Sequence, residues 1–133
     1  MVFLLSVALV TPYSYISINC TRFMNELLKS SLSNYGEYDM KYKGIISEEN
    51  YYFLNFRTRP SDRGYMDDEV IESYDFTVHI VVHDFEHATA NIRYSYKLVE
   101  KNGTIINGGS SVITVKMEYI DSRWIIISVY EEP

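Results

Sequence analysis

A chain of 133 residues is long enough for one domain with one modest core and too short for two. Apolar residues make up 47% and charged residues 23% of the sequence, which is typical of a globular protein and excludes a disordered one. Twelve basic and eighteen acidic residues give a net charge of -6, which argues against nucleic acid as the main partner because phosphate binding needs a basic face. The one cysteine excludes an internal disulfide framework.

The amino-terminal part is apolar. Residues 1–20 carry no charge, and 1–10 form a nearly continuous apolar run about half as long as a membrane span. Such a run is typical of the core of a secretory signal peptide, with Thr11 and Pro12 breaking it. We therefore expect residues 1–16 to be a signal peptide and the protein to be secreted or extracytoplasmic, with no stable transmembrane segment. The alternative is a cytoplasmic protein in which this segment packs into the domain.

One amphipathic helix is predicted from about Asn19, which can cap its start, to the stop signal Asn34-Tyr35-Gly36. Apolar residues recur there at spacings of three and four and line one face: Cys20, Phe23, Met24, Leu27, Leu28 and Leu32. The aromatic run 51–57 predicts a strand, preceded by a turn or short helix at 48–50. The charged segment 59–68 predicts a solvated loop.

The second half predicts four antiparallel strands. Residues 70–82 and 88–98 alternate between apolar and polar, and Asn102-Gly103 is a strong hairpin signal. A third strand runs to Ile120, and Asp121-Ser122 turns the chain into the last strand, 123–131. Closing the hairpins at these turns pairs Ile92 with Ile113, Ala90 with Val115, Ala88 with Met117, Tyr119 with Trp124, and Met117 with Ile126. One face then stays apolar across the strands, so residues 17–133 are predicted to be a single α+β domain.

The order of these elements and the ending of the chain resemble the nuclear transport factor 2-like superfamily. The ending that carries this resemblance is Lys116-Met117-Glu118-Tyr119-Ile120-Asp121-Ser122-Arg123-Trp124-Ile125-Ile126-Ile127-Ser128. The resemblance covers roughly residues 19–132. It implies a cone in which a curved sheet wraps around the helices and leaves a pocket at its open end. Some relatives are isomerases, hydratases or cyclases that use the pocket, whereas many others bind a partner or dimerise through the sheet.

Two short motifs raise the question of metal chemistry and modification. His83-Asp84-Phe85-Glu86-His87 matches the H-x-x-E-H pattern of one class of zinc peptidase, but its flanks favour strands over the helix that this chemistry needs. As a hairpin tip, the segment places His83 opposite His87 with His79 on the same face, which leaves a metal site as a minor alternative to solvated turn residues. Asn102-Gly103-Thr104 matches the N-glycosylation acceptor at a hairpin tip.

The inward face of the predicted sheet supplies a candidate pocket rich in tyrosine. Its polar residues are Glu72, Tyr74, Tyr94, Tyr96, Ser111, Ser128 and Tyr130. Glu72 with Tyr94 or Tyr96 is the acid and hydroxyl set that an isomerase or dehydratase could use, with Glu72 as the base. A tyrosine-lined pocket without a clear base favours binding of a small apolar ligand over catalysis, and we expect no cofactor.

The opposite face carries an apolar stripe that we expect to be an interface. Its members are Val112, Ile120, Ile125, Ile127 and Val129. The sequence thus predicts a non-catalytic binding domain that forms a homodimer or holds a protein partner. The two alternatives are the pocket enzyme and a structural subunit of a larger assembly.

Overall fold

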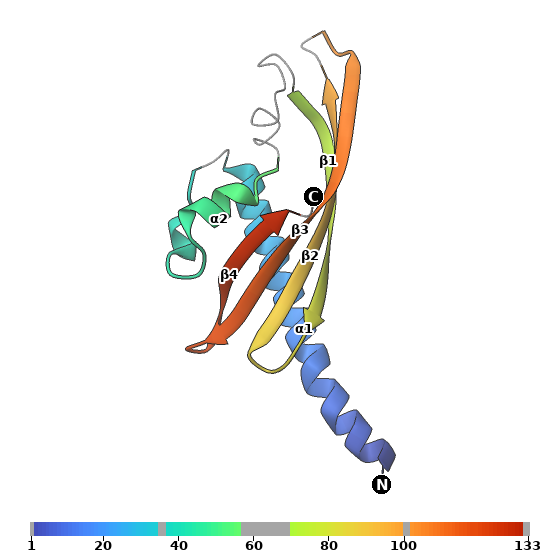
Figure 1. The fold of residues 1–133 in the computed structure, drawn as a ribbon, viewed down its shortest axis with the longest axis vertical. Helices are drawn as coiled ribbons and strands as arrows, with labels where there is room; N and C mark the ends of the chain where they lie inside the picture. Colours follow the sequence, from blue (N-terminus) through green and yellow to red (C-terminus); the bar gives the residue numbers. More distant parts are fainter. Residues whose placement is uncertain (1, 35–36, 57–69, 100–101, 132–133) are drawn as a thin grey trace.

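A computed structural model describes residues 2–34, 37–56, 70–99 and 102–131, with the side chains of these residues except 2–11, 70–72, 98 and 105–107. The elements in chain order are α1 (Val2–Ser33), a short 3-10 helix η1 (Met40–Tyr42), α2 (Glu48–Phe53), β1 (Val70–Val82), β2 (His87–Val99), β3 (Ile105–Ile120) and β4 (Arg123–Glu131). The fold is α+β, with a long amino-terminal helix and a four-stranded antiparallel sheet (Figure 1). Within the described ranges, no helix is both long and apolar enough to span a membrane.

Helix α1 buries the face that its periodicity predicts. Five of its side chains are at most 1% exposed, and they pack where the helix meets β1 and β2: Cys20, Met24, Leu27, Leu28 and Leu32. The predicted start at Asn19 is wrong, because α1 begins at Val2 and continues through Pro12. A proline removes one helical hydrogen bond but holds a helical φ, so turns formed on both sides of it can keep the helix continuous. The predicted boundary between residues 16 and 17 falls inside this helix.

The aromatic run after Ser47 forms helix α2 and not the predicted strand. Ser47 caps the helix, since its hydroxyl oxygen accepts a hydrogen bond from the Asn50 amide at 3.1 Å. Tyr51 is 1% exposed, and its backbone carbonyl accepts a hydrogen bond from the Ser31 hydroxyl of α1 at 2.8 Å. The segment therefore satisfies its polar groups within its own turn and against α1, and it has no need of a strand neighbour.

The sheet is a meander in the order β1-β2-β3-β4, and its hairpin registers confirm those predicted from the turns. The pairs Ile92–Ile113, Ala90–Val115 and Met117–Ile126 are present, and all six of these side chains are buried. Positive φ angles at Gly103, Asp121 and Ser122 close the two later hairpins. The predicted loop 59–68 lies outside the described residues.

Two irregularities interrupt this regular pairing. The register of β1 against β2 shifts between Ile71 and Ser73, at Glu72. Between β3 and β4, Met117 pairs with Ile126, and the preceding residue Lys116 pairs with Ser128. Ile127 of β4 is therefore an extra residue without a partner in the register, as in a β-bulge. Beyond the bulge, every side chain of β4 lies on the face opposite to the one that simple alternation predicts.

The loop before α2 lies against the outer edge of the last strand. The backbone amide of Ile126 in β4 donates a hydrogen bond to the carbonyl of Ile45 at 2.8 Å. The single hydroxyl hydrogen of Tyr38 is shared between the carbonyls of Tyr42 and Ile46, which holds this loop together. Helix α1 and the η1–α2 segment thus cover the inner face of the sheet and its β4 edge (Figure 1).

Candidate functional site

Three of the four tyrosines predicted to line an inner pocket form an aromatic cluster with Phe56. The rings of Tyr94 and Phe56 are parallel within 8° with centroids 4.4 Å apart, and Tyr96 stacks on Tyr94 at 6.2 Å. Tyr74 contacts the edge of Phe56 at 5.6 Å. Tyr94 and Tyr96 are 3% and 4% exposed, whereas Tyr74 is 41% exposed. Phe56, which follows α2, therefore fills the space between β2 and the helices, where the sequence analysis predicted a pocket.

A carboxylate that the sequence analysis missed joins this cluster. The hydroxyl of Tyr94 donates a short hydrogen bond to Oε1 of Glu131. Glu131 pairs with Ile113, whose side chain is fully buried, because the bulge at Ile127 turns it to the inner face. The run Ile125-Ile126-Ile127 interrupts the alternation of β4, but it does not indicate which residue is the extra one. This hydrogen bond connects β2 to β4. Because the ring of Tyr94 is held in the aromatic stack, we interpret the pair as structural and not as a site of proton transfer.

The same bulge separates the remaining residues of the predicted pocket. Ser128 pairs with Lys116 and Tyr130 pairs with Thr114, so their expected position on the inner face is wrong. Ser111 pairs with Tyr94 and is half-buried, as expected for a residue beside the cluster. The side chain of Glu72 lies outside the described residues, and its backbone is at the β1 irregularity. The described residues therefore do not bring the seven predicted pocket residues together.

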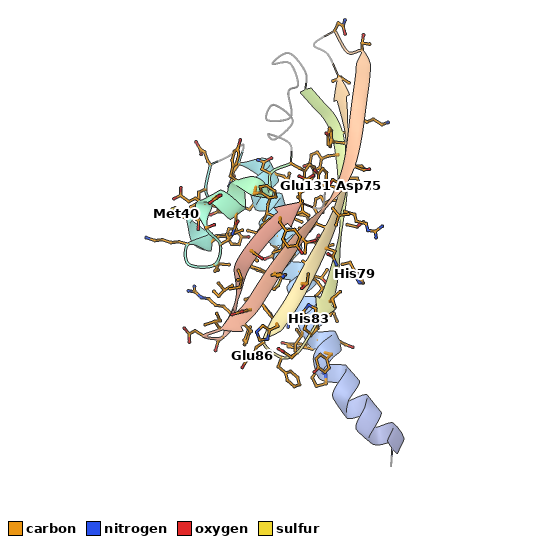
Figure 2. The ribbon with its side chains drawn as sticks, viewed as in Figure 1. Met40, Asp75, His79, His83, Glu86 and Glu131 are labelled. Atoms are coloured by element: carbon orange, nitrogen blue, oxygen red, sulfur yellow. The ribbon has the colours of Figure 1, made fainter. Side chains whose placement is uncertain are left out.

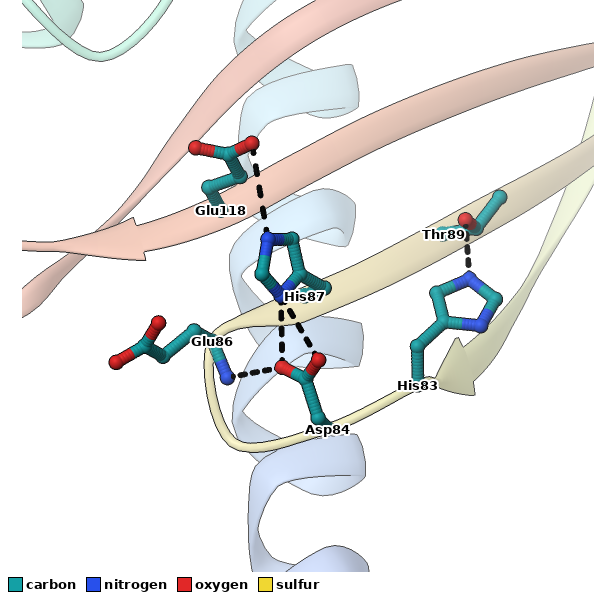
Figure 3. A network of polar contacts seen from close by, with 6 residues as sticks. All are labelled: His83, Asp84, Glu86, His87, Thr89 and Glu118. Carbon is teal, nitrogen blue, oxygen red and sulfur yellow. Dashed lines mark hydrogen bonds and ion pairs between the residues drawn. The ribbon is translucent and has the colours of Figure 1, made fainter.

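The three histidines lie on the outer face of the sheet or at the end of the β1–β2 hairpin (Figures 2 and 3). His83 lies opposite His87, as predicted, and donates its backbone amide to the His87 carbonyl at 2.9 Å. The His83 ring, however, contacts the Thr89 hydroxyl at 2.7 Å, and the His87 ring contacts Asp84 at 2.8 Å. In the described part of the chain, no three His, Cys, Asp or Glu side chains form a group that could hold a metal ion.

Polar contacts around His87 favour its protonated form. The hydrogen bond that the His87 ring donates to the Asp84 carboxylate raises the pKa of His87 above 6.5, and the nearby carboxylates of Glu118 and Glu86 act in the same direction. The pKa of Asp84 is lowered because the Glu86 amide donates to it at 2.7 Å and because His87 also bonds to it. The contact between His87 and Glu118 is longer, at 3.8 Å (Figure 3). The cluster is a solvated hairpin tip with an ion pair and lacks the helical geometry of a peptidase site.

The outer face of the sheet is grooved, and both polar and apolar side chains line the grooves. One cavity of about 520 Å³ lies over the middle of β1, β2 and β3, where Asp75, Thr77, Arg93, Ser95 and Ser110 line it. A second of about 510 Å³ shares Thr77 and Arg93 and reaches His79 and Asn91. A third, of about 270 Å³, lies at the hairpin end between His83, His87, Lys116, Glu118 and Ile127. Within the described residues, the Arg93 guanidinium forms no hydrogen bond or ion pair.

The predicted apolar stripe is divided by the bulge. Ile120 and Ile127 are 43% and 48% exposed, and Val112 and Ile125 are half-buried on the same outer face. Val129 pairs with the buried Val115 and packs against the core, so its expected exposure is wrong. The outer face gains Tyr130 in its place, at 42% exposure. Four of the five predicted stripe residues thus remain on a face that none of the described elements covers.

The predicted glycosylation residue lies at an accessible turn. Asn102 is exposed in the β2–β3 hairpin, and its side-chain oxygen accepts a hydrogen bond from the Thr104 amide at 2.9 Å.

Comparisons with known proteins leave the family of the chain unassigned. No protein-family model matches the sequence, and no curated protein matches it. Among solved structures, the "intermembrane space region of chloroplast protein ARC6" matches with a TM-score of 0.44 and 13% sequence identity, over 86% of this chain and 95% of that chain.

Proposed function

We propose that the chain is a non-catalytic binding domain that self-associates through the outer face of its sheet. The observation that carries the proposal is the contrast between the two faces. The inner face is closed by α1, α2 and the aromatic cluster, whereas the outer face bears exposed aliphatic side chains and no described element covers it. An uncovered sheet face with such side chains is typical of a protein interface.

Charge favours a second copy of the chain as the partner. The protein carries a net charge of -6, so most surfaces of two copies repel each other. On the outer face of β1–β3, in contrast, the charged side chains described are Arg93, Lys97 and Lys116 against Asp75 and Glu118, three basic and two acidic. Arg93 and Asp75 line the same cavity, so a two-fold axis through it would bring each residue near its opposite charge in the other copy.

The proposal includes the fold family and the location of the protein. A long helix against a meander of four strands supports a cone of the nuclear transport factor 2-like type, whose members commonly dimerise through this face. The uncharged amino-terminal segment supports an extracytoplasmic location. Neither inference is needed for the test of self-association.

The test is the molar mass of the purified chain measured by light scattering over a range of concentrations. We expect a dimer, and we expect Ile127→Lys to raise its dissociation constant by about tenfold or more, because the substitution buries an unpaired charge in the interface. Met40→Lys is the matched control, since Met40 is 62% exposed on η1, on the side of the molecule away from Asp75 and His79 (Figure 2). A wild-type monomer, or equal masses for the two variants, would contradict the proposal.

A further inference from the structure

The amino-terminal end of α1 projects beyond the sheet, past the hairpin that joins β1 and β2 (Figure 1). The projecting helix belongs to a segment, residues 1–20, that contains no charged residue. From Val2 to Val10 the sequence is apolar apart from Ser6. A helix of this composition is costly to expose to water, at about 25 cal/mol for each Å² of apolar surface, so it needs an apolar environment.

Aromatic and apolar side chains surround the base of the projecting segment. Tyr13 of α1 stacks on Phe85 at the tip of the β1–β2 hairpin, with ring centroids 5.2 Å apart and planes within 13°. Phe85 is nevertheless 56% exposed, and Tyr15 and Ile18 on α1 are 68% and 58% exposed. Exposed aromatic rings beside an apolar helix are the arrangement found where proteins meet the boundary between lipid and water.

The length of the apolar segment matches the depth of one leaflet. At 1.5 Å per residue, the nine residues from Val2 to Val10 span about 14 Å. The hydrocarbon core of a bilayer is about 30 Å thick, so one leaflet contributes about half of that depth. The helical conformation satisfies the backbone hydrogen bonds of the segment except those of the amides in its first turn, which have no partner within the helix and make insertion less favourable.

We propose that residues 2–10 of α1 insert into one leaflet of a lipid bilayer and that Tyr13, Tyr15 and Phe85 lie at its interface. The charges nearby indicate which lipids suit this contact. The hairpin tip carries the carboxylates of Asp84 and Glu86, and the whole chain is acidic. An anionic surface would repel these groups, so the inference is for zwitterionic lipid.

The experiment is flotation of the full chain with vesicles of phosphatidylcholine, after intact mass has established that residues 1–10 are present. We expect the wild-type protein to float, and to float less with vesicles containing phosphatidylglycerol. Val7→Asp should weaken the partition by at least about tenfold, because a carboxylate is costly within the hydrocarbon. Phe85→Ser should weaken it by about threefold through the loss of one interfacial ring. Met40→Ser is the control, since it removes an equally exposed apolar side chain from a surface away from the projecting helix.

Two results would overturn the inference. One is a wild-type chain that stays with the soluble fraction. The other is a Val7→Asp variant that floats like the wild type. If Val7→Asp instead changes the molar mass without vesicles and the wild type does not float, the projecting helix binds another copy of the chain and the lipid proposal is wrong. Ile127→Lys should float normally, so a failure of the sheet interface is separable from a failure of membrane binding.

Discussion

At the scale of single residues, the hairpin between β1 and β2 contains a contact that depends on protonation. The raised pKa of His87 means that its bond to Asp84 stabilises the folded chain fully below pH 6.5 and is lost as the pH rises through the folded value. The lowered pKa of Asp84 gives a contribution that is present above pH 3.8 and is lost as the pH falls through its folded value. The ion pair between His87 and Asp84 therefore stabilises the fold in the pH range between the lowered pKa of Asp84 and the raised pKa of His87.

Replacing Asp84 tests this assignment directly. In Asp84→Asn we expect the pKa of His87 to fall toward 6.5, because the variant removes the carboxylate that bonds to the imidazolium. The measurement is an NMR titration of the His87 ring proton. Glu49→Gln removes a carboxylate from α2 and should leave the titration unchanged. An unaltered His87 pKa in Asp84→Asn would show that the hydrogen bond is not its cause.

At the scale of elements, Tyr51 fastens α2 to α1. Its hydroxyl is 2.7 Å from the Ser30 hydroxyl and accepts a hydrogen bond from the Asn34 side chain at 2.9 Å. Tyr51→Phe should lower the free energy of unfolding by about 1–2 kcal/mol, since it leaves the side chains of Ser30 and Asn34 without this partner. Tyr52→Phe on the adjacent, 41% exposed residue should change it by less than about 0.5 kcal/mol. Urea unfolding of both variants measures the difference, and equal losses would refute the role of the hydroxyl.

The elements also show how far sequence reasoning reaches. The strand pairs of β2, β3 and β4 near their turns were predictable, because the turn residues and the alternation fix the same register independently. The bulge at Ile127 was not, because three consecutive isoleucines satisfy either face. That one extra residue puts Ser128, Val129 and Tyr130 on the faces opposite to those predicted, and it turns Glu131 to the inner face. Helix α2 was missed because its aromatic residues have high strand propensity, whereas packing against α1 decides its structure.

At the scale of the whole molecule, the reactivity of the Cys20 thiol measures how readily the core opens. The residue has no exposed surface, and burial raises the pKa of its thiol to about 11. At pH 8 we expect a disulfide reagent to modify the native chain at least about a thousandfold more slowly than the chain in guanidinium, since reaction requires opening of the core.

The control for this labelling moves the thiol to the surface. In the double variant Cys20→Ser, Ser14→Cys, the cysteine occupies an exposed position of α1 and should react readily without denaturant. Rapid labelling of native Cys20 would mean that α1 separates from the sheet far more easily than its packing indicates.

The hydrogen bond from Ile126 to Ile45 has a consequence for how sheets of this protein can grow. An open sheet edge is a template for strand addition and for amyloid-like aggregation. Because the loop before α2 occupies the β4 edge at Ile126, a foreign strand would have to displace that loop before it could pair there. Blocking of this edge disfavours continuous sheets built through β4. The other edge of the sheet is β1, and a continuous sheet would need the blocked β4 edge as well.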